Sequence, residues 1–263
     1  MPNWEKFEKE CTEYLNKEFN DFCKFIHIGR SDSTVPDILV KTYSGKTFYI
    51  EVKQSPAQCG QFVLLPDIKT QRFVYSSRNI NENNKFAEQI ISFMDTDFNS
   101  YKEAGTAGKE ICFEGSENIF SNWIKLIYTK KNVEFFITNK YNIIPVQDFN
   151  NFFNVSAKYR VKRSGSSAVP KNKREKVINF IYNLNYNIEE IINNNKNIYI
   201  KSSQNIDKIR FIVDDYEYML SRRDDLYEIR QLSNTFNANV IFSIELMNDM
   251  QGLSKEQFIK NLR

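Results

Sequence analysis

The chain contains a single histidine, His27, among its 263 residues. Zinc hydrolases, and hydrolases that use a serine–histidine or cysteine–histidine pair, need histidines as metal ligands or bases. One histidine is enough for a triad, but the sequence has no Gly-x-Ser-x-Gly nucleophile elbow to partner it. We therefore expect that, if the protein is an enzyme, carboxylates and lysines carry its chemistry.

Cysteine pairs of the Cys-x-x-Cys kind are also absent. The four cysteines lie far apart in the sequence, at Cys11, Cys23, Cys59 and Cys112. Such spacing argues against a zinc site and indicates no disulfide framework. Buried thiols are the simpler interpretation.

Long apolar runs are missing, since no segment approaches the roughly 18 apolar residues that a membrane helix needs. The first ten residues, MPNWEKFEKE, lack both the basic start and the apolar run of a secretory signal. A content of 41% hydrophobic and 26% charged residues is typical of a soluble globular protein. We expect a cytoplasmic protein that does not engage a membrane.

Hydrophobic spacing predicts a mixture of helices and strands. Apolar residues recur at intervals of three and four over residues 4–22, which predicts an amphipathic helix. The remaining patterns predict helices at 85–94 and 173–184, strands at 35–43, 47–53, 123–130, 133–139, 143–146, 197–201, 208–213, 227–232 and 239–246, and a last helix with a capping box of Ser254 and Gln257. This order predicts an α/β core followed by a β-rich extension.

The segment VPDILVKTYSGKTFYIEVKQ, residues 35–54, predicts a hairpin with acidic and basic residues on one face. If Ser44–Lys46 form the loop, Leu39 faces Glu51 and Asp37 faces Lys53. The other face is then continuously apolar, formed by Ile38, Val40, Phe48, Ile50 and Val52. A loop of two or four residues would reverse the parity of one strand, unless a bulge restored it.

In this register Asp37 and Glu51 are diagonal neighbours, and Lys53 lies opposite Asp37. Two carboxylates so placed suit Mg²⁺, which takes oxygen ligands and is commonly held by one or two carboxylates. Lys53 would orient the attacking water and offset charge on a phosphate, or help to deprotonate the water if its pKa were lowered. The alternative interpretation is a hairpin with a charged solvent face.

The same residues resemble the PD-(D/E)xK nuclease superfamily, which includes most type II restriction endonucleases. Pro36-Asp37, thirteen intervening residues and Glu51-Val52-Lys53 are similar to its motif. Many members carry a glutamate on the first helix, in a pattern that Phe7-Glu8, Cys11 and Leu15 resemble. The resemblance covers residues 4–54 by motif.

The resemblance implies a central mixed β-sheet flanked by helices, with an α+β extension at the C-terminus. It also implies Mg²⁺-dependent hydrolysis of double-stranded DNA that leaves 5′-phosphates. Asp37 and Glu51 would bind the metal with the carbonyl of Val52, Lys53 would act on the water, and Glu8 would be an auxiliary carboxylate.

A basic segment follows the predicted core. Between Arg160 and Lys176 lie seven lysines and arginines against one acidic residue, Glu175. We expect DNA contacts here, although such runs are also found on solvated surfaces. The candidate residues are Arg160, Lys162, Arg163, Ser164, Ser166, Lys171, Lys173 and Arg174. The expected division is a catalytic core at 1–156 and a DNA-recognition or dimerisation region at 157–263.

A homodimer is expected if the DNA target is palindromic, because two-fold symmetry would place one site on each strand. Three alternatives stay open. The protein could be another nuclease of the superfamily, acting in repair, at junctions or on modified DNA. It could be a DNA-binding protein without catalysis, or an α/β protein without a nucleic-acid partner.

Overall fold

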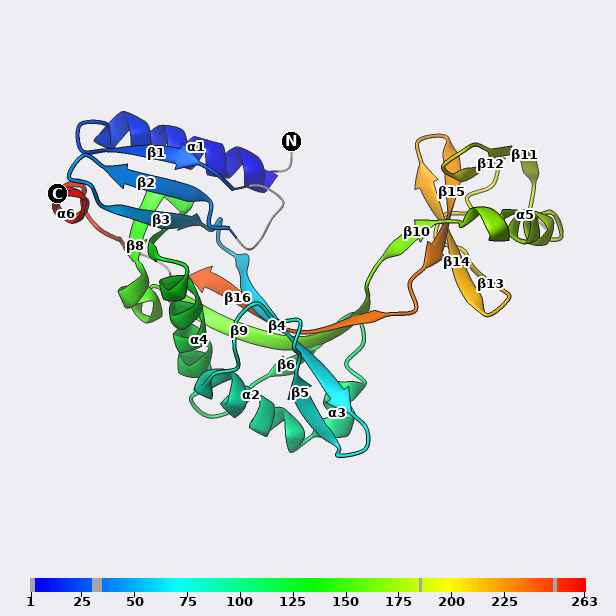
Figure 1. The fold of residues 1–263 in the computed structure, drawn as a ribbon, viewed down its shortest axis with the longest axis horizontal. Coiled ribbons are helices and arrows are strands. Elements are labelled where there is room, and N and C mark those ends of the chain that lie inside the picture. The colour runs from blue at the N-terminus through cyan, green and yellow to red at the C-terminus, as the bar shows by residue number, and fades with distance from the viewer. Residues whose placement is uncertain (1–2, 30–34, 185, 248–249) are drawn as a thin grey trace. The chain divides into compact units, whose positions relative to one another are not determined.

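The computed structural model describes residues 3–29, 35–184, 186–247 and 250–263. The chain forms two compact units (Figure 1). The first contains residues 1–160 together with 238–263, and the second contains residues 161–237. Each unit is built around its own buried apolar cluster.

A five-stranded mixed sheet carries the predicted hairpin. Its order is β1 (Cys23–His27), β2 (Ile38–Thr42), β3 (Thr47–Val52), β7 (Val133–Thr138) and β8 (Asn142–Pro145). Strands β3 and β7 run parallel, whereas the other described neighbours are antiparallel. The expected mixed sheet is therefore present.

Helices cover both faces of this sheet (Figure 1). On one face, α1 (Asn3–Phe19) and α6 (Lys255–Leu262) pack against the apolar side chains of β2 and β3. Leu15 of α1 and Phe258 of α6 are fully buried there, and Ser254 and Gln257 form the predicted capping box. On the other face, Tyr128 of α4 (Ser116–Lys130) packs edge-on against Phe136 of β7.

The hairpin register differs from the predicted one by two residues. Ile38 pairs with Ile50 and Lys41 with Thr47. The loop is shifted by one residue, because Thr42 and Lys46 close it and Gly45 adopts a positive φ of 96°. A loop of unchanged length preserves the parity, so the even-numbered apolar residues face the core as expected.

Residues 123–130 are helical, not the predicted strand. Trp123, Ile124, Ile127 and Tyr128 are the buried residues of this stretch of α4. These positions recur with the period of a helix, but a short apolar run resembles a buried strand when its flanks are ignored.

A second sheet of the first unit has the order β5 (Arg72–Tyr75), β4 (Ala57–Asp67), β16 (Phe236–Leu246), β9 (Phe153–Arg163) and β6 (Lys109–Ile111). Helices α2 (Lys85–Asp95) and α3 (Phe98–Lys102) belong to the same unit. Aromatic side chains fill its interior, where Trp123 lies with its ring centroid 5.6 Å from Phe62 and 4.5 Å from Phe242.

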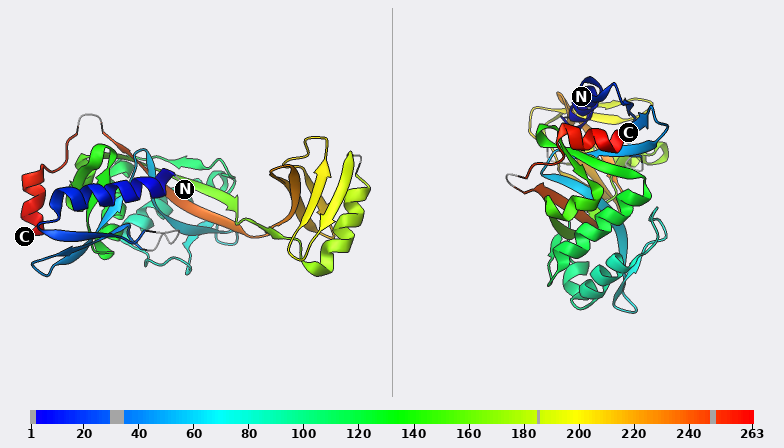
Figure 2. Two further views of the ribbon diagram at one scale, coloured as in Figure 1. Left: turned by 90° about the horizontal axis from the view of Figure 1, so that it is seen from above. Right: turned by 90° about the vertical axis from the view of Figure 1, so that its left-hand side faces the viewer.

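The second unit contains one sheet and one α-helix among its described residues. The sheet has the order β11 (Ile188–Asn193), β12 (Ile198–Ser202), β15 (Leu226–Leu232), β14 (Tyr216–Arg223) and β13 (Arg210–Val213), and β10 (Ser166–Ala168) pairs with β15. Helix α5 (Arg174–Tyr182) lies along one face (Figure 2). Its residues Val177 and Ile181 are fully buried in the apolar cluster of that face.

The division of the chain differs from the expected one at its C-terminal end. The expected boundary after residue 156 is close to the start of the second unit, at residue 161. Residues 238–263, however, return to the first unit, because β16 pairs with β4 and α6 packs on the first sheet. The C-terminal region is therefore not one block.

No described helix is both long and apolar enough to cross a membrane. All four cysteines are free. Cys11, Cys23 and Cys59 are buried as expected, whereas Cys112 is exposed.

Two glycines with positive φ allow a test of the packing around Trp123. A Cβ atom on Gly60 would lie 2.8 Å from Cζ3 of Trp123, whereas a Cβ on Gly45 would meet nothing within 4 Å. Gly60→Ala and Gly45→Ala share the backbone strain, so we expect Gly60→Ala to lower the free energy of unfolding by about 1–3 kcal/mol more. Urea denaturation measures the difference. Equal losses would contradict the contact.

Candidate active site

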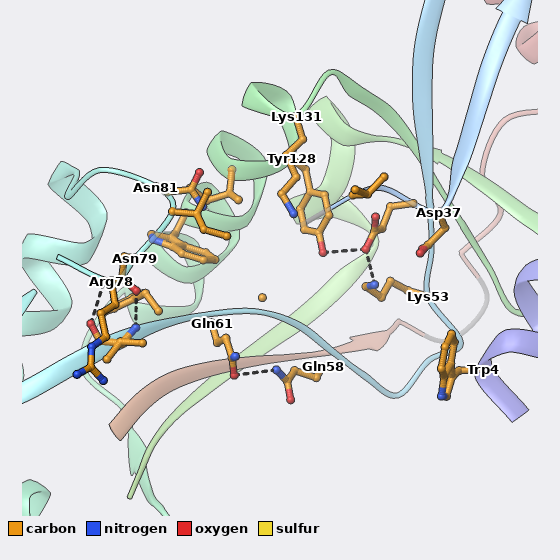
Figure 3. A pocket seen from close by; sticks show the side chains of 18 of the residues that line it. Trp4, Asp37, Lys53, Gln58, Gln61, Arg78, Asn79, Asn81, Tyr128 and Lys131 are labelled. Atoms are coloured by element: carbon orange, nitrogen blue, oxygen red, sulfur yellow. Dashed lines mark hydrogen bonds and ion pairs between the residues drawn. The ribbon is translucent and has the colours of Figure 1, made fainter. Parts of the chain in front are cut away.

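A cavity of about 500 Å³ lies in the first unit (Figure 3). Side chains from α1, β3, β4 and α4 line it, together with the segment 78–81. Its lining includes the four predicted catalytic side chains, Glu8, Asp37, Glu51 and Lys53. Residues distant in the sequence therefore share one hollow.

The carboxylate of Glu51 is held from two sides. Lys53 Nζ donates a hydrogen bond to Glu51 Oε1 at 2.5 Å, and the hydroxyl of Tyr128 donates to the same oxygen at 3.1 Å. Figure 3 shows the labelled side chains of Lys53 and Tyr128 with dashed lines that meet at one oxygen, which the two hydrogen bonds identify as Oε1 of Glu51. Glu51 is only 7% exposed, so these donors replace the water that it would otherwise have.

Asp37 is fixed through both its side chain and its backbone. Its Oδ2 accepts from the backbone N–H of Val52 at 2.8 Å. Its carbonyl oxygen accepts from the N–H groups of Ile28 and Gly29, each at 2.9 Å. Continued by one residue, the register of β2 and β3 sets Asp37 directly opposite Glu51, instead of diagonal to it.

Glu8 reaches the same place from α1. A Cβ atom on Gly29 would lie 2.7 Å from Glu8 Oε2 and 3.0 Å from Asp37 Oδ1. Both carboxylates therefore border a small space that the absence of a side chain at Gly29 leaves open. Glu8 is 8% exposed, and its Oε2 lies 2.9 Å from Nε2 of His27, which donates to it.

The sequence interpretation missed three residues of this site. The sequence offers no nucleophile for His27, and the structure shows that its partner is the carboxylate of Glu8. Its position at the end of the strand before Asp37 was the available signal. Tyr128 was assigned to a strand, and nothing in the sequence singles out Gly29.

No protein-family model and no curated protein matches the chain. Among solved structures, HhaI endonuclease in complex with DNA is similar, with a TM-score of 0.70 and 38% sequence identity. The match covers 99% of this chain and 95% of that one. The chain belongs to the family of HhaI endonuclease. The restriction-endonuclease-like fold expected from the sequence is thereby confirmed.

In this member of the HhaI endonuclease family, the carboxylates of Asp37 and Glu51 repel one another. Burial, followed by the negative charge of Glu51, raises the pKa of Asp37 from 3.8 to about 7. The ammonium of Lys53 and the N–H of Val52 oppose this shift without cancelling it. Burial lowers the pKa of Lys53, but the charges of Glu51 and Asp37 outweigh burial and raise it above its usual value. Lys53 is therefore an ammonium ion here, which favours its orienting role over that of a base.

The donor set fits a hard divalent cation. Oε1 of Glu51 and Oδ2 of Asp37 accept hydrogen bonds from the protein, and the described residues place no donor on Oε2 or Oδ1. A cation between the two side chains would relieve the repulsion that raises the pKa of Asp37. The described residues contain no group of three His, Cys, Asp or Glu side chains disposed to hold a metal. Any cation here would rely on the two carboxylates together with ligands other than His, Cys, Asp or Glu side chains.

The predicted DNA-contacting residues do not form one cluster. Arg174 supports a turn, since its guanidinium donates to the carbonyls of Val169 at 3.2 Å and Lys196 at 2.7 Å. The ammonium of Lys173 lies over the ring of Tyr216, 2.9 Å from its centroid. These two basic residues are engaged in holding the second unit together.

The other predicted contacts have different surroundings. Arg160 and Lys162 lie near the end of β9, and Lys162 and Lys171 are exposed. The hydroxyl of Ser164 lies 2.9 Å from that of Ser233. Arg163 contacts Glu217, and Ser166 accepts from Arg230, both on the face of the second sheet that α5 does not cover.

The raised pKa of Asp37 predicts how stability depends on pH. The folded protein keeps this proton up to about pH 7, whereas the unfolded chain releases it near 3.8. The stability contributed by Asp37 is therefore complete below the lower value and is lost as the pH rises through the higher one. Asp37→Asn removes the titration, so we expect the variant to gain stability relative to the wild type as the pH rises from about 4 to about 7.

Urea denaturation in chelating buffer at several pH values measures this difference. Asp67→Asn, at an exposed hairpin tip, controls for the loss of one carboxylate. A difference between Asp37→Asn and the wild type that stays constant across the range would contradict the coupling.

Proposed function

We propose that this member of the HhaI endonuclease family is a magnesium-dependent type II restriction endonuclease. It hydrolyses phosphodiester bonds of double-stranded DNA at a short specific sequence and leaves 5′-phosphates. The observation that carries this proposal is the convergence of Asp37, Glu51 and Lys53 in one cavity. The family relationship supports it, since HhaI endonuclease was solved in complex with DNA.

The residues have distinct functions in this proposal. Asp37 and Glu51 hold Mg²⁺ with the carbonyl of Val52, which are the functions that the PD-(D/E)xK resemblance implies for these residues. When bound, Mg²⁺ activates water and offsets charge on the phosphate. The ammonium of Lys53, fixed on Glu51, faces the cavity and stabilises negative charge that develops on the scissile phosphate. Glu8 adds a third carboxylate to the lining of the cavity, and its carboxylate is held by His27.

DNA contacts come from basic side chains that the fold leaves available. Lys162 and Lys171 are exposed and suited to phosphates. The same proposed set includes Arg160, Arg163, Ser164 and Ser166. Lys173 and Arg174, in contrast, already make contacts within the second unit, so their first function is structural. A homodimer on a palindromic target is part of the proposal, and sedimentation of the protein with and without DNA measures it.

Cleavage assays test the proposed activity. Wild-type protein incubated with phage DNA and Mg²⁺ should give discrete fragments with 5′-phosphate ends, and none in chelator. Lys53→Ala removes the charge beside the scissile phosphate and should slow cleavage by about 10²–10³-fold. Lys41→Ala, on the exposed side of β2, is the matched control and should cleave normally. An undiminished rate for Lys53→Ala would refute this site, and a smear would point to a nuclease without sequence specificity.

Tyr128 offers a test of the support behind Glu51. Tyr128→Phe removes only the hydroxyl that donates to Oε1, so the carboxylate loses part of its orientation. We expect the Mg²⁺ concentration for half-maximal cleavage to rise by roughly 10- to 100-fold, with a smaller change at saturating metal. Tyr75→Phe is the control, because that hydroxyl donates to the carbonyl of Asn81 elsewhere in the cavity lining. Identical Mg²⁺ profiles would contradict this role.

A further inference from the structure

Lys53 lies just beyond the end of its strand, where regular pairing no longer holds the chain. Strand β3 ends at Val52, and the last pair that it forms with β2 is that of Ile50 with Ile38. On the side of β7, pairing ends one residue before Lys53, where Val52 pairs with Ile137. Regular pairing therefore stops before the residue whose ammonium the proposed reaction uses.

One backbone hydrogen bond continues the ladder with β7 past this point. The N–H of Lys53 donates to the carbonyl of Ile137 at 2.9 Å. In an evenly spaced parallel ladder, the next N–H on this side would be that of Ser55, and its acceptor would be the carbonyl of Asn139. Strand β7 ends one residue before that acceptor, however, and the chain enters a short turn, η1 (Asn139–Tyr141). The backbone of β7 therefore leaves the ladder here.

The side chain of Asn139 replaces the missing part of the ladder. Its Oδ1 accepts from the N–H of Ser55 at 2.9 Å, and its Nδ2 donates to the carbonyl of Ser55 at 2.8 Å. A carboxamide carries the same kinds of donor and acceptor as a peptide group, so it can replace a backbone partner in both directions. Asn139 thus clamps the chain shortly after Lys53 by two hydrogen bonds.

Ser55 is also held from the second sheet of the first unit. Its Oγ accepts from the N–H of Leu246, the last residue of β16, at 2.7 Å. Three hydrogen bonds therefore converge on Ser55 from two segments that are distant in the sequence. Strand β4 of that second sheet begins shortly afterwards, at Ala57. The chain that follows Lys53 is thus fixed at the junction of the two sheets.

The position of this backbone decides where the ammonium of Lys53 can reach. A lysine side chain is a flexible four-carbon stem, so its charged end is only as well placed as its backbone and its partner. The Nζ atom lies 2.5 Å from Oε1 of Glu51, and the side chain is 17% exposed in the lining of the cavity. A misplacement of about 1 Å at a reacting group can slow a reaction by about 10²-fold. Small shifts of the backbone after β3 would therefore affect the reaction.

A clamp of this kind is not by itself a sign of function. At the other end of the same strand, Nδ2 of Asn132 donates to the carbonyl of Thr47 at 3.0 Å. The two asparagines flank β7, and each bonds a carbonyl at one end of β3. Only the clamp of Asn139 adjoins Lys53, whereas Thr47 is the first residue of β3. A comparison of the two asparagines therefore separates a positioning function from a contribution to stability alone.

We propose that Asn139 is a positioning residue for Lys53, because it fixes the chain at Ser55 and so holds the ammonium at the scissile phosphate. This inference rests on the proposed endonuclease function and adds to it a residue outside the recognisable motif. Asn139 acts through the backbone, since it is not among the described residues that line the cavity. Its loss should slow the chemical step and leave the affinity for DNA unchanged.

Aspartate variants of the two asparagines provide a matched test. Asn139→Asp and Asn132→Asp each keep the shape of the side chain and one acceptor oxygen, lose the NH₂ donor to a carbonyl, and add one negative charge. Aspartate also tolerates the positive φ of 57° at Asn132. A third variant, Asn139→Ala, removes both bonds to Ser55 without adding a charge. Single-turnover cleavage at saturating Mg²⁺ and protein gives the rate, fluorescence anisotropy in chelator gives the DNA affinity, and urea denaturation gives the stability.

We expect Asn139→Asp and Asn139→Ala to slow cleavage roughly 10- to 100-fold, and Asn132→Asp to stay within about threefold. The DNA affinities of Asn139→Asp and Asn132→Asp should be equal. Equal slowing in these two variants would overturn the proposal, because the clamps would then only stabilise the strand. An unchanged rate in Asn139→Ala would also overturn it. Weaker DNA binding by Asn139→Ala alone would do the same, since the side chain would then contact DNA.

Amide hydrogen exchange, followed by NMR in chelator without DNA, tests the clamp without catalysis. In the wild type the N–H of Ser55 should exchange slowly although it lies outside any strand, because Asn139 accepts from it. In Asn139→Ala the N–H groups of Ser55 and Lys53 should exchange roughly tenfold faster. The N–H of Tyr49, which donates to the carbonyl of Asn132, should not change. Fast exchange at Ser55 in the wild type, or unchanged exchange at Lys53 in the variant, would overturn the proposal.

The two proposals fail in different ways. Discrete wild-type fragments with unchanged rates in the Asn139 variants would refute the positioning residue and leave the endonuclease intact. Absence of cleavage by the wild type would refute the endonuclease. Hydrogen exchange would then decide by itself whether Asn139 holds the backbone of Lys53.

Discussion

The site depends on the mutual repulsion of two carboxylates that the hairpin register brings together. Asp37 and Glu51 face each other at the ends of β2 and β3, and their proximity helps to raise the pKa of Asp37 to about 7. An ammonium and a hydroxyl hold Glu51, and a backbone N–H holds Asp37. Folding forces the pair together, and the residues that the structure describes place no donor on Oδ1 of Asp37 or Oε2 of Glu51, so the pair is suited to a divalent cation.

Each element of the surrounding fold supplies one part of this arrangement. The α1 helix brings Glu8, the end of β1 brings His27, and α4 brings Tyr128 from the opposite face of the sheet. Gly29 leaves the space on which the carboxylates of Glu8 and Asp37 border. The site is therefore a product of the whole first sheet with its helices, although the recognisable motif occupies one hairpin.

The sequence was sufficient for what depends on local periodicity. Alternation in the hairpin predicted which residues of β2 and β3 share a face, and a loop of three residues preserved the parity although its position shifted by one. Apolar spacing predicted the helix α1, on which Glu8 lies. The prediction of a strand at residues 123–130 was wrong because a short apolar run is compatible with the period of a strand or of a helix. Tyr128 lies in this stretch, so its position in the site was not predicted either. The contacts of His27 with Glu8 and of Asn139 with Ser55 depend on tertiary or cross-strand pairing, which no local pattern encodes.

Calorimetric titration of the protein with Mg²⁺ near neutral pH tests the central claim most directly, because it measures the carboxylate pair without DNA or catalysis. The account predicts that one Mg²⁺ binds each chain with release of protons from Asp37, detected by repeating the titration in buffers of different ionisation enthalpy. Asp37→Asn should abolish this binding. Equal Mg²⁺ affinity in the wild type and in Asp37→Asn would contradict the account, because the opposed carboxylates would then not be the cation site.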